Sequence, residues 1–342
     1  MLREIVDSGN FKAGRVDRSV IIKIRGKDSH MMERFLCSML QVLRIFLFAL
    51  AILTPAVAQA EKVQAIEPLI SHNTRLMVFS PHPDDESLGA GGLIQRVLTA
   101  GGRVKVVFMT NGDGFPEGVE TEHHIAVPTA KDYRKYGEER RLEVLKAITT
   151  LGLKERDVIF LGFPDGGLNY LRLEYRSHLK PYMSPFTREK RPPAFEVIVP
   201  RTDYCGRDLR KEVERVIADF RPNLVATTPR EDEHPDHSAT YYFVKKALAH
   251  WTNKNPNQIK PNFLTFLIHF GQWPIAQGAG TGLRLDPPGG FPDKKEWIAF
   301  QLKPEEMKTK RKAILEYRTQ MLVMGRFLLS FARSNELFIS ED

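Results

Sequence analysis

The sequence has only two cysteines among its 342 residues, which excludes a fold held together by disulfides. Cys37 lies within the first sixty residues, so Cys205 is the single cysteine of the main body. The sequence also lacks a basic stripe interleaved with aromatic residues. Its net charge of +8 is shared equally between residues 1–60 and the rest of the chain. We therefore predict no nucleic-acid partner.

Long apolar runs are lacking as well. Residues 45–53 are continuously apolar, but this run is short for a membrane span. Arg34 and Arg44 precede it, and Ala58-Gln59-Ala60 follows it. This order is typical of a secretory signal peptide, so we predict one within residues 31–60, cleaved after Ala60. Translation then begins at Met1 or at Met31/Met32, and the product is periplasmic or extracellular. The alternative is an uncleaved membrane anchor, the one route by which we expect membrane contact.

What the sequence does have is a regular alternation of apolar and amphipathic segments after residue 74. We predict strands at 75–80, 104–109, 158–161, 224–228 and 263–270, with helices at 87–99, 131–151, 208–220 and 237–251. Such alternation predicts an α/β fold with a doubly wound, mostly parallel sheet and helices on both faces. We expect an edge strand at 297–302, a helix from Pro304 to about 321 and a last helix at 325–333. Residues 61–342 then form a single catalytic domain, with an irregular, proline-rich insertion at about 168–206.

Two short motifs of histidine and aspartate each follow a predicted strand and begin a predicted helix. The first is Pro-His-Pro-Asp-Asp-Glu at 81–86, and the second is His-Pro-Asp-His at 234–237. The carboxyl ends of parallel strands are where an open α/β sheet binds its ligand. We therefore predict that the two motifs form one metal site.

A catalytic zinc takes three protein ligands and leaves one position open. His82, Asp85 and His237 complete such a set. Asp84 remains free to act as a general base, and His234 as a general acid or as a donor to an oxyanion. Asp236 is placed to orient a histidine. Glu86 has two interpretations, a solvated helix start or support for the site. The glycines at 89, 91 and 92 lack the dinucleotide-binding spacing, so we predict no nicotinamide cofactor.

The two motifs together resemble those of the PIG-L/LmbE-like de-N-acetylases. The resemblance extends to Arg140-Arg141-Leu142-Glu143, to Phe160 through Gly166, to Lys312 through Gln320 and to Phe331 through Phe338, and so covers about residues 75–338. It implies a Rossmann-like fold and metal-dependent removal of an N-acetyl group, usually from N-acetylglucosamine. It assigns metal binding to His82, Asp85 and His237, the base to Asp84 and an electrophilic role to His234.

The resemblance also suggests residues that contact the substrate. Arg140 resembles a substrate-binding arginine, although a solvated helix charge is an equal alternative. Tyr317 and Gln320 are either pocket residues or packing residues. The leader and the 168–206 insertion differ from small cytoplasmic members, which argues against a small intracellular substrate.

The sequence thus predicts an exported zinc-dependent deacetylase of a glycan or glycolipid that contains N-acetylglucosamine. Zn²⁺ is the expected cofactor, with Fe²⁺ as another possible divalent ion, and an N-acetylated sugar is the expected partner. One alternative is a metal-dependent carbohydrate esterase that uses the same site. The other is a non-catalytic glycan-binding protein.

Overall fold

The computed structural model describes residues 65–278, 280, 282–292 and 296–341. The predicted signal peptide lies outside these residues. The chain from Lys62 to Asp342 forms one compact unit. Within the described part of the chain, no helix is both long enough and apolar enough to cross a membrane.

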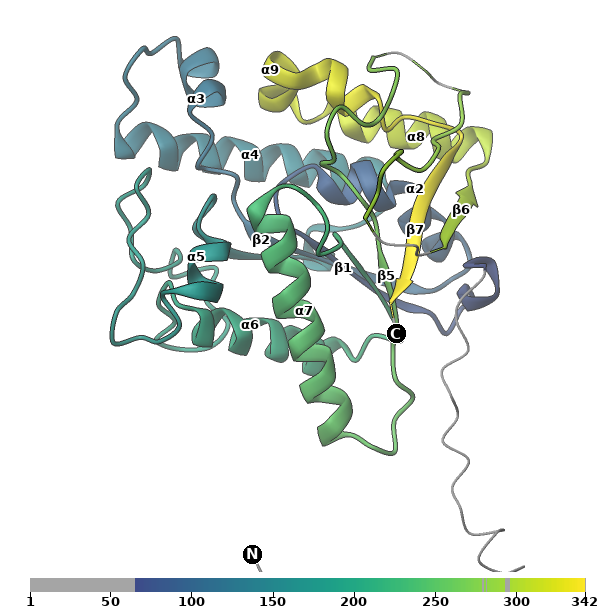
Figure 1. Ribbon diagram of the computed structural model, residues 1–342, viewed down its shortest axis with the longest axis horizontal. Coiled ribbons are helices and arrows are strands. Elements are labelled where there is room, and N and C mark those ends of the chain that lie inside the picture. The colour runs from purple at the N-terminus through teal and green to yellow at the C-terminus, as the bar shows by residue number, and fades with distance from the viewer. Residues whose placement is uncertain (1–64, 279, 281, 293–295, 342) are drawn as a thin grey trace, which may run out of the picture. The chain divides into compact units, whose positions relative to one another are not determined.

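Seven strands in the described residues form one sheet in the order β3-β2-β1-β4-β5-β7-β6 (Figure 1). The first five strands of this order are parallel to one another, and β7 pairs antiparallel with both β5 and β6. The predicted mostly parallel sheet is therefore confirmed. The strands are β1 (Arg75–Ser80), β2 (Arg103–Thr110), β3 (Val158–Phe163), β4 (Leu224–Thr227), β5 (Asn262–Thr265), β6 (Trp297–Gln301) and β7 (Asn335–Glu341).

Helices cover both faces of the sheet, as predicted. Leu76 and Val78 of β1 belong to one buried core with α2, α4 and α8, whereas Met77 and Phe79 belong to a second core with α5, α6 and α7. Successive side chains of a strand point to opposite faces, so an uninterrupted apolar strand serves both cores. The helices are α2 (Asp85–Thr99), α3 (Pro116–His123), α4 (Ala130–Thr150), α5 (Leu168–Leu173), α6 (Gly206–Phe220), α7 (Pro235–Lys254), α8 (Pro304–Leu315) and α9 (Arg318–Leu329), with short 3-10 turns at Glu67–Leu69 and Glu155–Asp157.

The strand order reverses at β1. The chain runs from β1 outward to β2 and β3, and then returns to β4 on the other side of β1. The loops that follow β1 and β4 therefore leave the same edge of the sheet side by side. This is the position at which doubly wound sheets bind ligands, and it holds both histidine–aspartate motifs.

Several parts of the prediction differ from the structure. The helices α3 and α5 were not predicted, and α5 lies within the insertion that was expected to be irregular. The predicted strand at 263–270 ends at Thr265, because the backbone N–H groups of Ile268 and His269 donate to the Asp232 carboxylate instead of to a neighbouring strand. The predicted helix from Pro304 to about 321 and the predicted last helix at 325–333 are instead α8 and α9, which separate around Tyr317, and α9 ends at Leu329. The strand β7 was not predicted, and it occupies the position between β5 and the expected edge strand β6.

Candidate active site and metal centre

The loop between β1 and α2 holds the first motif in a tightly bonded, buried turn. Ser80 Oγ donates to the carbonyl of His82, and Thr110 Oγ1 donates to the carbonyl of Pro81. Asp84 precedes α2 with φ of 123°, a conformation that non-glycine residues seldom adopt. Such strain persists only where the surroundings impose it.

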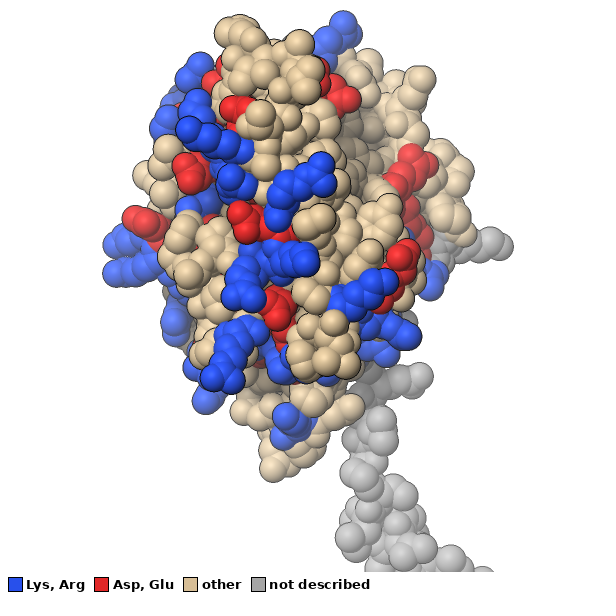
Figure 2. Space-filling view, turned by 90° about the vertical axis from the view of Figure 1, so that its left-hand side faces the viewer, with Lys and Arg blue, Asp and Glu red and all other residues tan. Residues whose placement is uncertain are grey.

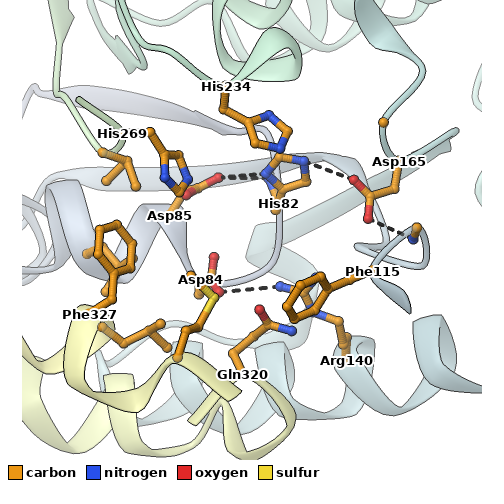
Figure 3. A pocket seen from close by; sticks show the side chains of 16 residues that line it. His82, Asp84, Asp85, Phe115, Arg140, Asp165, His234, His269, Gln320 and Phe327 are labelled. Carbon is orange, nitrogen blue, oxygen red and sulfur yellow. Dashed lines mark hydrogen bonds and ion pairs between the residues drawn. The ribbon is translucent and has the colours of Figure 1, made fainter. Parts of the chain in front are cut away.

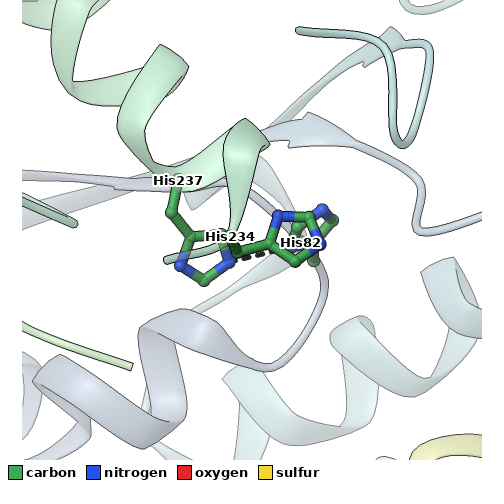
Figure 4. A group of neighbouring side chains, drawn as sticks. All are labelled: His82, His234 and His237. Atoms are coloured by element: carbon green, nitrogen blue, oxygen red, sulfur yellow. Dashed lines mark hydrogen bonds between the residues drawn. The ribbon is translucent and has the colours of Figure 1, made fainter. Parts of the chain in front are cut away.

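Three potential ligand atoms meet between the two motifs. His82 Nδ1 lies 3.1 Å from His237 Nε2 and 3.4 Å from Asp85 Oδ2, and the last two atoms are 3.2 Å apart. Figure 4 shows the rings of His82, His234 and His237 gathered at the start of α7. The structure thus brings together the three side chains that the sequence predicted as ligands.

This triangle fits a divalent metal. Ligand atoms about 2.0–2.1 Å from a tetrahedral zinc lie roughly 3.3 Å from one another, close to the three distances observed. The two neutral imidazole nitrogens and the carboxylate oxygen are all acceptors in their ligating forms, so they need a shared cation. The side chains of His234 and His269 also lie within reach of a metal in this cluster.

Carboxylates lie behind both histidines. Asp165 Oδ1 is 3.0 Å from His82 Nε2, and Asp232 Oδ2 is 3.2 Å from His237 Nδ1. This leaves the other nitrogen of each ring directed at the triangle, the usual arrangement around a metal. Asp236, predicted to orient a histidine, lies 3.6 Å from His82 Nε2. Its shorter contacts are with the backbone N–H groups of residues 166 and 168, so it also fixes the loop after β3.

The electrostatics of the site favour a positive charge at the triangle. Burial lowers the pKa of both histidines, but the neighbouring carboxylates outweigh it. They raise the pKa of His82 well above its ordinary value and that of His237 to about 9. Burial opposes ionisation of Asp85, yet the two histidines hold its pKa well below the usual range. A bound divalent cation would neutralise the charge of the same carboxylates without protonation of the histidine rings.

Asp84 stands apart from the triangle and lines the cavity. Burial and the neighbouring Asp85 raise its pKa well above the ordinary value, while Arg140 opposes this shift. Arg140 Nη2 lies 3.3 Å from Asp84 Oδ2 and donates to the Pro83 carbonyl, and Nη1 donates to the Gly112 carbonyl. Because Arg140 is only 3% exposed, the alternative of a solvated helix charge is wrong. Figure 3 shows this pair at one side of the cavity.

His234, like His269, is neutral at this site because burial and the neighbouring histidines lower its pKa. Burial and the nearby His82 and His237 lower its pKa to about 2. Its Nδ1 accepts the backbone N–H of Asp236 at 3.2 Å, so the neutral ring carries its proton on Nε2. This tautomer can donate a hydrogen bond to an oxygen in the cavity.

A network of buried hydrogen bonds stabilises the turn between β1 and α2. Glu86 is fully buried, so the solvated helix-start interpretation is wrong. Its carboxylate accepts the backbone N–H of Asp84 at 3.2 Å and the hydroxyls of Ser87 and Tyr317. Tyr317 therefore acts inside the core. Gln320 lines the cavity and donates to Tyr136 Oη.

The cavity above the cluster has a volume of about 260 Å³. Its polar side holds five of the predicted residues, His82, Asp84, Asp85, Arg140 and His234. Asp165 and His269, which were not assigned to the site from the sequence, also line it, whereas the fully buried His237 does not. Its opposite wall is apolar and comes largely from α9, where Phe327 stacks on the His269 ring at 5.3 Å (Figure 3). The apolar lining residues are Leu88, Phe115, Ile268, Met324, Phe327 and Leu328.

The residues that sequence reasoning missed lie outside the two motifs. Asp165 follows β3, Asp232 lies two residues before His234, and His269 follows β5. Each of the three residues follows a strand of the parallel sheet. Their position after a predicted strand is the one feature of the sequence that could have placed them at the carboxyl edge of the sheet.

Comparison with known proteins gives a consistent result. The sequence profile of the PIG-L family, described as GlcNAc-PI de-N-acetylase, matches residues 77–248. A 1D-myo-inositol 2-acetamido-2-deoxy-alpha-D-glucopyranoside deacetylase from Nakamurella multipartita is 30% identical over 178 residues, covering 51% of this chain and 54% of that protein. The protein of the same name from Mycobacterium sp. (strain KMS) is 27% identical over 210 residues, covering 60% and 61%. The chain thus spans little more than half the length of these curated relatives.

Among solved structures, N,N'-diacetylchitobiose deacetylase from Pyrococcus horikoshii aligns over 86% of this chain and 92% of its own. The TM-score is 0.52 and the sequence identity is 17%. At this identity the likeness concerns the fold.

Proposed function

The chain belongs to the PIG-L family of GlcNAc-PI de-N-acetylases, and from this premise we propose that it hydrolyses the N-acetyl group of an N-acetylglucosamine residue in a glycan or glycolipid. The observation that carries the proposal is the triangle of His82, Asp85 and His237 with Asp84 free beside it. The triangle supplies ligands for one cation, and Asp84 supplies a separate base. The names of the Nakamurella and Pyrococcus relatives support an N-acetylated sugar as substrate.

His82, Asp85 and His237 would hold the cation, for which Zn²⁺ is the first candidate and Fe²⁺ the second. When bound, such an ion polarises the amide carbonyl and favours ionisation of water near neutral pH. Asp165 and Asp232 keep the two histidine rings directed at the ligand position.

Asp84 accepts a proton from the water that attacks the acetyl carbon. Arg140, at 3.3 Å, keeps this carboxylate oriented. His234 donates its Nε2 proton as a hydrogen bond to the oxygen that becomes negative in the transition state. Asp84 then returns the proton to the leaving nitrogen as the C–N bond breaks. The products are acetate and a free amino sugar.

The esterase alternative uses the same residues but expels an alkoxide instead of an amine. A glycan-binding protein without catalysis would need neither a base nor an oxyanion donor. The presence of Asp84 and a neutral His234 in one cavity therefore favours hydrolysis.

Acetate release tests this proposal directly. The full chain is incubated with N-acetylglucosamine glycans, glycolipids and an O-acetylated sugar, with chelator and after re-addition of zinc or iron. We expect amide-specific release that chelator abolishes and one metal restores. Release from the O-acetylated sugar alone would establish the esterase. No release from a metal-loaded protein would overturn the proposed activity.

Two variants separate the base from the ligands. Asp84→Asn should retain metal but lose activity by roughly a hundredfold or more, the usual contribution of a general base. Asp85→Asn should lose both metal and activity. Full activity of the Asp84 variant would contradict its role.

We also propose that the protein is exported, on the strength of residues 31–60. N-terminal sequencing of the mature protein should start at Glu61. A start before that residue, together with recovery in the membrane fraction, would support the uncleaved anchor instead.

A further inference from the structure

A second feature of the molecule lies on the surface formed by α5, the turn after it and the outer side of α7. We call this the α5–α7 surface. Its own segments are cationic, because Glu174 is the only acidic residue within 168–182 and 238–249. Its five cationic residues are Arg172, Arg176, Lys180, Lys245 and Lys246.

Contacts between aromatic rings and cations connect the parts of this surface. Arg172 lies 5.6 Å from the centroid of the Tyr242 ring, and Lys246 lies 5.8 Å from the same ring. Lys180 lies 5.1 Å from the Tyr175 ring, which packs edge-on against Tyr182. Tyr170 of α5 stacks on Tyr182, so the turn and the helix form one folded unit.

Between α5 and α7 this surface has a groove of about 480 Å³. Arg172, Lys245 and Lys246 line it, and so does Arg230, which pairs with Glu231 at 2.6 Å. Among the described residues no aspartate or glutamate lines the groove itself, although Tyr241 in its wall donates to Glu341. Tyr241, Tyr242, Ser238 and Ala249 form its remaining wall. Cationic groups around a small groove match the chemistry of a phosphate headgroup.

Apolar side chains protrude beside these cations. Leu179 is 85% exposed and Leu173 is 54% exposed, and Tyr170 and Tyr242 are also exposed. Figure 2 views the side of the molecule that carries α5 and the insertion, and it shows many Lys and Arg side chains with Asp and Glu side chains interspersed among them. A soluble polyanion would use the cations but not the exposed leucines.

We propose that the α5–α7 surface docks the protein on an anionic phospholipid bilayer. Leu173 and Leu179 enter the boundary of the acyl chains, the tyrosines lie at the interface, and the cations contact lipid phosphates. The surface begins two residues after Gly166, which lines the catalytic cavity. Docking does not depend on the N-terminal leader.

Sedimentation with lipid vesicles tests the proposal. The compact unit from Lys62 to Asp342 is used, because it contains the whole sheet and both cores and excludes the apolar run at 45–53. We expect it to sediment with phosphatidylcholine vesicles that contain phosphatidylglycerol, and much less with phosphatidylcholine alone. Binding should weaken as salt is added. Equal binding to both vesicle types, or to neither, would overturn the proposal.

Matched variants locate the contact. Arg176→Glu with Lys180→Glu should weaken binding by about 25-fold or more, since each cation near an anionic bilayer contributes about fivefold. Arg311→Glu with Lys312→Glu, exposed positions on α8, changes the net charge equally and should have little effect. If the control loses as much affinity, net charge rather than this surface is responsible.

A third variant distinguishes a bilayer from a soluble polyanion. Leu173→Ser with Leu179→Ser keeps every cation and removes the apolar contact. We expect vesicle binding to fall at least severalfold. Unchanged binding would refute membrane insertion and indicate a purely ionic partner. Acetate release from a soluble N-acetylated sugar is measured on each variant, so that failure of docking is separated from failure of the proposed activity.

Discussion

Asp232→Asn tests whether the carboxylate behind His237 tunes the metal site. Asp232 Oδ2 faces three groups, His237 Nδ1 at 3.2 Å and the backbone N–H groups of Ile268 and His269 at 3.0 Å. Its Oδ1 accepts the backbone N–H of His234 at 3.0 Å. An asparagine amide can keep its oxygen toward the first three groups only by turning its NH₂ toward the fourth donor. The substitution therefore removes one hydrogen bond and the negative charge next to His237.

Loss of such a partner lowers metal affinity by about 10–100-fold, equivalent to about 1.4–2.7 kcal/mol. The dissociation constant for zinc is measured by competition with a chromophoric chelator. Asp219→Asn, at an exposed position on α6, is the matched control and should leave it unchanged. If Asp232→Asn remains folded and binds zinc within twofold of the wild type, either His237 is not a ligand or Asp232 does not orient it.

Tyr317→Phe removes a hydroxyl donor from buried Glu86, so we expect a loss of about 1–3 kcal/mol in unfolding free energy. We also expect a lower kcat with an unchanged zinc titration. A kcat equal to that of the wild type would show that this hydrogen bond does not position Asp84. Burial and the charge of Asp165 raise the pKa of Asp113 to about 8. The folded state therefore binds the Asp113 proton more tightly than the unfolded state does. The stability that this proton contributes to the fold is lost as the pH rises from about 4 toward 8. The advantage of Asp113→Asn in urea unfolding should grow between pH 5 and pH 8; a constant difference would contradict the shift. Chelator should lower the Tm, because metal at a hundredfold excess over its Kd stabilises the fold by about 2.7 kcal/mol; an unchanged Tm would mean that no metal was bound.

The parallel half of the fold was predictable because its strands are buried on both faces and appear as continuous apolar runs. The strand β7 has a different pattern. Asn335, Glu336 and Glu341 are all buried in it, and Glu336 accepts the backbone N–H groups of residues 92 and 93 on α2 and pairs with Lys310. Polar and charged residues of this kind are usually found at the surface, and only the tertiary partners of Glu336 explain why it lies inside.

The same limit applies to the site. Local spacing pointed to His82, Asp84, Asp85, His234 and His237, because each motif presents its reactive groups within a few residues. The groups that orient them come from other loops, as Asp165 does after β3. No spacing rule connects such a residue to the first motif, since the sheet order alone brings them together.

Glu86 shows how far this dependence extends. At a helix start, a solvated glutamate would interact favourably with the helix dipole and would need no partner. Here it is buried at a cost, and Tyr317, from 231 residues away, supplies a compensating donor. The buried carboxylate of Glu86 has a structural role, because it accepts the backbone N–H of Asp84 and so stabilises a turn with positive φ. This backbone conformation is strained for any residue other than glycine. The turn directs the Asp84 carboxylate into the cavity while Asp85 faces the histidines. The different orientations of the two adjacent aspartates thus depend in part on a distant tyrosine that stabilises the glutamate beside them.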